Sequence, residues 1–122
     1  IHTPGHTSNH ICYALLDENI LFSGDHVMGW STTVIVPPDG NMDDYLASLK
    51  KLLSRNEDRF FPTHGPIIDN PKKLVNDYIS HRLDRERQII DAIKKGKGDY
   101  GYDAEKRLET HEIRRWLRMV WR

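Results

Sequence analysis

Three short loops of this chain carry residue types that bind metal ions. His6 lies in TPGHT, Asp25 in SGDH and His64 in PTHGP, and each loop is bracketed by glycine or proline. Imidazole and carboxylate groups are ordinary ligands of zinc and similar divalent metals. Glycine lets a backbone turn tightly and approach an ion closely. Taken singly, each of these residues is more often an ordinary loop side chain, but the three loops together favour a metal site.

The composition is that of one small domain with a polar surface. Of the 122 residues, 38% are hydrophobic and 30% are charged, and 18 basic residues balance 18 acidic ones. No overall positive field therefore points to nucleic acid. The charge is uneven, because residues 1–81 carry 6 Lys and Arg against 10 Asp and Glu, whereas residues 82–122 carry 12 against 8. The basic C-terminal part weakly suggests an anionic partner, although a solvated helical face explains it better.

Cysteine and hydropathy patterns bear on the compartment. The single cysteine, Cys12, rules out a disulfide within the chain and fits a reducing compartment, so we expect a cytoplasmic protein. The longest apolar runs span only a few residues, which predicts no membrane span and no signal peptide. The chain begins at Ile1 inside a motif, and we expect it to be a fragment of a longer protein.

The hydrophobic pattern predicts a layered α/β fold with an antiparallel start. Two short β-type runs, 11–16 and 20–23, are separated by Asp-Glu-Asn and predict a hairpin that leads into the aspartate loop. A further strand is predicted at 31–36, before a Pro-Pro-Asp-Gly turn, and another at 59–61, before the last histidine loop.

Apolar residues at helical spacing predict three helices. The first spans 43–54, with acids at its start and lysines near its end. The second begins at Pro71 after the cap residue Asn70 and continues to about Gly96, as one helix or as two in line. The third starts at Thr110 and has a complete apolar face, formed by Ile113, Trp116, Leu117, Val120 and Trp121.

The order of motifs resembles the second half of the metallo-β-lactamase-fold hydrolases. HTPGHT, a hairpin, FSGDH, a helix and PTHGP follow one another over nearly the whole chain. The sequence YISHRLDRERQII at 78–90 is similar to the linker helix of the β-lactamase-like group that includes endoribonucleases and glyoxalase II-like hydrolases. The resemblance implies half of an αββα sandwich at 1–70, a linker helix at 71–95 and, at 96–122, the truncated start of a winged-helix-like helical appendage.

The resemblance also implies a site with two zinc ions or other divalent metals. By motif position, His6 would bind the first metal, Asp25 would bridge both as the catalytic carboxylate, and His64 would bind the second. The implied mechanism is attack of a metal-activated hydroxide on a carbonyl or phosphoryl centre. The family motif H-x-H-x-D-H, which supplies four further ligands, is absent from these residues. The chain alone is therefore expected to be inactive or to bind one metal loosely.

The predicted function is metal-dependent hydrolysis by an intact parent protein. An aspartate stands where antibiotic-hydrolysing members of the family carry a cysteine, which disfavours β-lactamase activity. The expected substrate is a thioester, a lactone or another small ester, or single-stranded RNA. One alternative is a non-catalytic fragment that self-associates into a homo-oligomer. Another is a nucleic-acid-binding module built on the arginines of the C-terminal segment, Arg114, Arg115, Arg118 and Arg122.

Four further residues are candidates for supporting roles. His10 and Thr7 could orient a ligand by a hydrogen bond, or could simply flank a turn and start a strand. His81 and Arg82 match the family helix and could line a substrate groove, or could only pack and cap that helix. The remaining histidines and the cysteine are interpreted as structural or solvent-exposed residues: His2, Cys12, His26 and His111.

Overall fold

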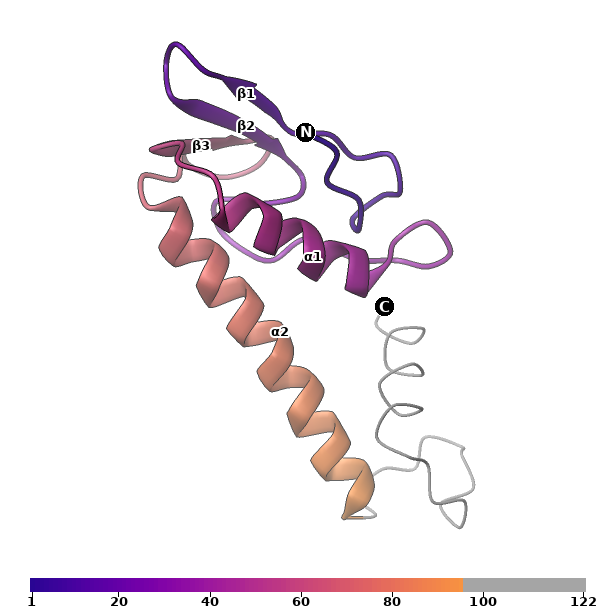
Figure 1. Ribbon diagram of the computed structural model, residues 1–122. Helices are drawn as coiled ribbons and strands as arrows, with labels where there is room; N and C mark the ends of the chain where they lie inside the picture. Colours follow the sequence, from indigo (N-terminus) through magenta and orange to yellow (C-terminus); the bar gives the residue numbers. More distant parts are fainter. Residues whose placement is uncertain (96–122) are drawn as a thin grey trace.

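The computed structural model describes residues 1–95 (Figure 1). Its elements are β1 (Tyr13–Leu15), β2 (Ile20–Gly24), α1 (Met42–Leu53), β3 (Arg59–Pro62) and α2 (Pro71–Lys94). They form a small α/β unit with a three-stranded sheet, so the predicted fold class is confirmed at that level. The predictions made for 96–122, namely the winged-helix-like start, the apolar helix and the arginine segment, lie outside the described residues.

The sheet is mixed, with strand order β1-β2-β3. β1 and β2 form the predicted antiparallel hairpin, in which Tyr13 faces Phe22, but both paired runs begin and end a little differently from the prediction. β3 lies parallel to β2, with Leu21 opposite Phe60. A parallel pair needs a crossover connection, and α1 belongs to that crossover. The loops that follow β2 and β3 therefore start at the same edge of the sheet.

The two helices cover one face of the sheet and bury its core. Both lie on the same side of the strands in Figure 1. Strand residues alternate between the two faces, so on β2 Leu21 is fully buried whereas Phe22 is 45% exposed. The opposite face keeps large apolar side chains in solvent, with Tyr13 67% and Leu15 45% exposed. The buried cluster comprises Cys12, Leu21, Val27, Ile35, Tyr45, Leu49, Leu52, Phe60, Ile68, Val75 and Tyr78.

The helix boundaries follow from local capping signals. The Asn41 side chain accepts hydrogen bonds from two backbone N–H groups of the first turn of α1. The Asn70 side chain accepts from the Lys73 N–H, and Pro71 occupies the first position of α2, as predicted. α2 is one continuous helix of 24 residues. No helix in the described residues 1–95 is long and apolar enough to cross a membrane.

The predicted strand at 31–36 is wrong. This segment is not paired in the sheet, although its composition is β-type. Its carbonyl groups bind other partners: Thr33 accepts from the Arg82 side chain, Val34 from the His6 side chain, and Val36 from the Gly40 N–H. A backbone whose acceptors are used in this way does not need a strand ladder. The segment is instead a loop that reaches the candidate site.

Candidate metal centre

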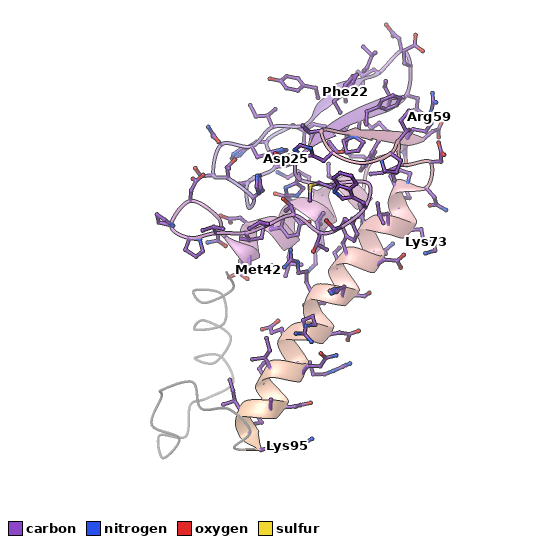
Figure 2. The ribbon with its side chains drawn as sticks, turned by 180° about the vertical axis from the view of Figure 1, so that it is seen from behind. Phe22, Asp25, Met42, Arg59, Lys73 and Lys95 are labelled. Carbon is purple, nitrogen blue, oxygen red and sulfur yellow. The ribbon has the colours of Figure 1, made fainter. Side chains whose placement is uncertain are left out.

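The structure brings His6, Asp25 and His64 together. Nε2 of His6 lies 3.8 Å from Oδ2 of Asp25, and Nε2 of His64 lies 3.4 Å from Oδ1. Each imidazole thus faces a different oxygen of one carboxylate. Asp25 directly follows β2 and His64 follows β3, so the parallel pairing of these strands places both loops at one edge. Figure 2 shows Asp25 among these loops, below the strand residues Phe22 and Arg59.

His6 is oriented by its second ring nitrogen. Nδ1 lies 2.7 Å from the carbonyl oxygen of Val34 and 3.1 Å from the hydroxyl oxygen of Thr33. A carbonyl group only accepts, so Nδ1 carries a proton and donates it, and a neutral His6 ring in this arrangement has its lone pair on Nε2. That lone pair is on the nitrogen nearer Asp25. Metal-bound histidines in proteins are held in the same way, by a carbonyl acceptor on the other nitrogen.

The His64 loop is held by close backbone contacts. The His64 carbonyl accepts from the Gly29 N–H at 3.0 Å. A Cβ atom on Gly29 would lie only 2.3 Å from the Pro66 carbonyl oxygen, and Gly65 has a φ of +93°. Both glycines are therefore required for this approach of two loops. The His64 imidazole itself remains 54% exposed.

The donor types fit a metal ion, but residues 1–95 do not complete a site. No group of three or more His, Cys, Asp or Glu side chains in this part of the chain is arranged to hold a metal ion. Oδ1 of Asp25 is nevertheless buried and makes no hydrogen bond within residues 1–95. A carboxylate oxygen shielded from water needs a hydrogen-bond donor or a cation. Two imidazoles and a carboxylate are donor types that a divalent metal accepts, and a complete site would need further ligands from outside residues 1–95.

His10 lies between the candidate ligands and the core. Its Nδ1 is 2.8 Å from the Thr3 hydroxyl oxygen, and its ring centroid lies 6.4 Å from that of His6. A Cβ atom on Gly24 would lie 2.7 Å from its Nε2, so the ring covers the residue that precedes Asp25. Burial lowers the pKa of His10, the neighbouring His6 lowers it further, and Asp25 opposes both effects. The hydrogen bond of the His10 ring goes to Thr3 and not to a candidate ligand, so the orienting role stays a prediction.

His26, interpreted from the sequence as a residue outside the site, is a buried packing residue beside Asp25. Its side chain is fully buried, and neither ring nitrogen has a hydrogen-bond partner within residues 1–95. The ring lies between those of His10 and Tyr45, at centroid distances of 5.4 and 4.7 Å. Burial lowers the pKa of His26 to about 3, so the imidazole is neutral. The Tyr45 hydroxyl donates to the His26 carbonyl at 3.1 Å and so fixes the backbone next to Asp25.

The remaining candidates for supporting roles, Thr7, His81 and Arg82, differ in their contacts with the site. Thr7 contributes its carbonyl, which accepts from the Gly5 and His10 N–H groups at 3.1 and 3.5 Å and closes the His6 loop. His81 is exposed, and no hydrogen bond or ion pair joins it to the three candidates. Arg82 is half-buried and donates to the Thr33 carbonyl.

Two residues interpreted as structural are placed as expected. Cys12 is a buried free thiol in the core, and burial raises its pKa. His2 is exposed, and its Nε2 lies 3.0 Å from the Ser8 carbonyl. Neither residue approaches the Asp25 carboxylate by a hydrogen bond or an ion pair, so both stay outside the candidate site.

The family of the chain follows from its sequence. The metallo-beta-lactamase superfamily model matches residues 1–64, which is more than half of the chain. The chain belongs to the metallo-beta-lactamase superfamily.

Relatives in this superfamily are substantially longer. A "Beta-lactamase-like protein 2 homolog" of Caenorhabditis elegans is 45% identical over 94 residues, which are 77% of this chain and 30% of the relative. An "Atrochrysone carboxyl ACP thioesterase" of Aspergillus fumigatus is 34% identical over 94 residues, covering 77% of this chain and 29% of the relative. The chain thus spans about 30% of the length of these relatives.

Solved structures confirm the fold and include a metal-bound neighbour. A metallo-beta-lactamase family protein from Thermus thermophilus superposes with a TM-score of 0.72 at 20% identity, over 76% of this chain and 32% of that protein. A second neighbour, solved in a di-iron-bound form, is 31% identical with a TM-score of 0.55 over 60% of this chain and 37% of its own. The chain therefore has part of the metallo-beta-lactamase fold.

Proposed function

We propose that this chain is the part of a metal-dependent hydrolase that contributes His6, Asp25 and His64 to a two-metal centre. The observation that carries the proposal is the placement of one carboxylate between two imidazoles, with Oδ2 facing His6 and Oδ1 facing His64. His6 and His64 would each bind one ion, and Asp25 would lie between the two. Zinc is the proposed metal, and the di-iron form of one structural neighbour supports a two-metal centre in this fold.

The proposed reaction is hydrolysis of a thioester or another small ester. A bound divalent metal polarises a carbonyl oxygen and generates a nucleophile from water at neutral pH. The residues of this chain orient the ligands: the Val34 carbonyl holds His6, and backbone contacts hold the His64 loop. Relatives named as acyl carrier protein thioesterases favour the thioester among the substrates considered, and single-stranded RNA remains the second choice.

The same proposal includes a division of the chain. Residues 1–70 would be the second half of an αββα sandwich, 71–95 a linker helix and 96–122 the start of a winged-helix-like segment. The described part contains a sheet with one uncovered apolar face, which suits a half-sandwich that packs against another layer. The four ligands of the H-x-H-x-D-H motif would then come from outside these 122 residues.

Metal content tests the proposed site directly. The protein, purified and exposed to zinc, is expected to hold about one or more zinc ions per chain by elemental analysis. His64→Ala and Asp25→Asn should each reduce the zinc content, because each removes a donor from the centre. His2→Ala is the matched control, since His2 is an exposed histidine outside the cluster and its loss should leave the zinc content unchanged.

Hydrolysis of an acyl thioester probe then tests the reaction. The intact parent protein, loaded with zinc, is expected to cleave the probe, whereas residues 1–122 alone are expected to be inactive, and Asp25→Asn in the parent should lower the rate about tenfold or more. A folded protein that binds no zinc would contradict the proposed site. A zinc-loaded protein that cleaves RNA but no thioester would keep the site and overturn the substrate.

A further inference from the structure

One irregular segment contacts all three candidate ligands. Residues 26–34, here called the ligand segment, lie between β2 and α1 and include no strand. The segment starts directly after Asp25, one of its backbone N–H groups donates to the His64 carbonyl at 3.0 Å, and one of its carbonyl groups accepts from His6 at 2.7 Å. Because no sheet ladder fixes this backbone, its position depends on side chains that reach it from other elements.

Three side chains from the two helices hold the ligand segment. Tyr45 of α1 and Tyr78 of α2 each donate a hydroxyl hydrogen bond to one of its carbonyl groups, at 3.1 and 2.7 Å. Arg82, one turn beyond Tyr78 on α2, donates to the carbonyl of Thr33. The guanidinium of Arg82 also lies over the Tyr45 ring, 5.8 Å from its centroid. Arg82 therefore links α2, α1 and the part of the segment nearest His6.

We propose that Arg82 is a positioning residue for the metal centre and acts on His6 through Thr33. The Thr33 hydroxyl oxygen lies 3.1 Å from Nδ1 of His6, and the next carbonyl along the chain, that of Val34, accepts from the same nitrogen. Fixing the Thr33 carbonyl thus fixes both groups that orient the imidazole. The inference rests on the proposed function, because it concerns the same ligands.

The chemistry of the side chain explains why an arginine occupies this position. A planar guanidinium can donate to a carbonyl and stack on an aromatic ring at once, whereas an ammonium group cannot reproduce that pair of contacts. Arg82 is half-buried, so its hydrogen bond is partly protected from competing water. Loss of a group that orients a metal-bound histidine typically costs roughly 10–100-fold in metal affinity.

Zinc affinity and the tautomer of His6 together test this role. Arg82→Met removes the donors but keeps an unbranched stem, and Arg82→Lys keeps the positive charge. Arg87→Met is the matched control, because Arg87 lies exposed on the same helix and pairs with Asp84 at 2.9 Å. The zinc dissociation constant is measured by competition with a chelating dye. The His6 tautomer is measured by ¹⁵N NMR in the metal-free protein, and thermal unfolding reports on folding.

The expected result is a roughly 10–100-fold higher zinc dissociation constant for Arg82→Met, with loss of the Nδ1-protonated tautomer of His6. Arg82→Lys should fall between Arg82→Met and the wild type, and Arg87→Met should match the wild type. An Arg82→Met protein that folds, binds zinc like the wild type and keeps the His6 tautomer would overturn the inference. If Arg82→Met does not fold, Arg82→Lys carries the same comparison.

The two proposals fail in distinguishable ways. If the wild-type protein binds no zinc, the proposed function is overturned, and the tautomer comparison in the metal-free protein still decides whether Arg82 orients His6. If the wild type binds zinc and neither Arg82 variant changes the affinity or the tautomer, only the positioning role is overturned.

Discussion

His26 is a buried imidazole whose surroundings favour the neutral form. Its side chain has no exposed surface, and burial is the main reason why its pKa falls from 6.5 to about 3. Positive charge on the neighbouring His10 and His6 would act in the same direction. Since the ring packs between His10 and Tyr45, it fills space beneath the Asp25 loop as an apolar side chain would.

The stability of the metal-free protein should therefore decrease in acid. In the unfolded chain His26 binds a proton below about pH 6.5, whereas in the folded chain it resists protonation until about pH 3. The stabilisation is fully present above pH 6.5 and is lost as the pH falls through this window. Between about pH 7.5 and about pH 5 the expected loss of unfolding free energy is about 2 kcal/mol. Urea denaturation at the two pH values measures it.

A leucine at this position isolates the contribution of the imidazole. His26→Leu should reduce the difference between the two pH values by about 2 kcal/mol, because leucine does not titrate. His2→Leu should leave the difference unchanged, since His2 is exposed. An equal pH dependence in wild type and His26→Leu would show that this imidazole is not held neutral.

The residue types in the sequence indicate the candidate ligands, but they do not indicate the groups that hold those ligands in position. Gly and Pro beside His6, Asp25 and His64 mark loops, and loops with metal-binding side chains are recognisable from the sequence. The acceptor that orients His6 lies 28 residues away, on Val34, so no local pattern indicates it. The burial of His26 likewise depends on α1, which packs against it from a later part of the chain.

Among the elements, the helices were predictable because their signals are local. The caps Asn41 and Asn70 and the apolar spacing within each helix lie in the helix sequence itself or beside it. The strand prediction at 31–36 was wrong because β-type composition does not show whether a neighbouring strand is available. The parallel pairing of β2 with β3, which brings two candidate ligands together, is also a non-local property.

The contact between the His6 loop and α1 depends on one glycine. Gly5 has a φ of +137°, and a Cβ atom built on it would lie 2.3 Å from the backbone of Tyr45. The Gly5 carbonyl also accepts from the Asn41 N–H at 2.8 Å, so the loop is joined to the start of α1. No side chain fits between these two backbones, and any other residue must separate the loop from the helix.

Gly5→Ala is expected to lower the free energy of unfolding by about 3 kcal/mol or more, because it combines backbone strain with a clash against backbone atoms. The loss is measured by urea denaturation. Zinc affinity should fall with it, since His6 is the next residue. Asn9→Ala, an exposed change in the same loop, should alter stability by less than about 0.5 kcal/mol. Wild-type stability in Gly5→Ala would contradict the close packing of loop and helix.

Within residues 1–95, the face of the sheet opposite the two helices presents large apolar side chains to solvent. Phe22 and Tyr13 are cross-strand partners on this face and are 45% and 67% exposed. Phe61 of β3 extends it, with its ring 5.7 Å from that of Phe22. Contiguous exposed apolar side chains favour association with another surface. When this chain is alone in solution, the partner that can cover this face is a second copy of the chain.

Light scattering on the 122-residue chain should therefore give a mass above the 14.3 kDa of the monomer. Phe22→Lys should shift the mass toward the monomer, because a charge at the centre of the face must be desolvated on association. Leu83→Lys is the matched control, since Leu83 on α2 is 46% exposed and lies away from the sheet. A wild-type chain that stays monomeric at high concentration would contradict self-association. An equal effect of both variants would place the contact elsewhere than on this face.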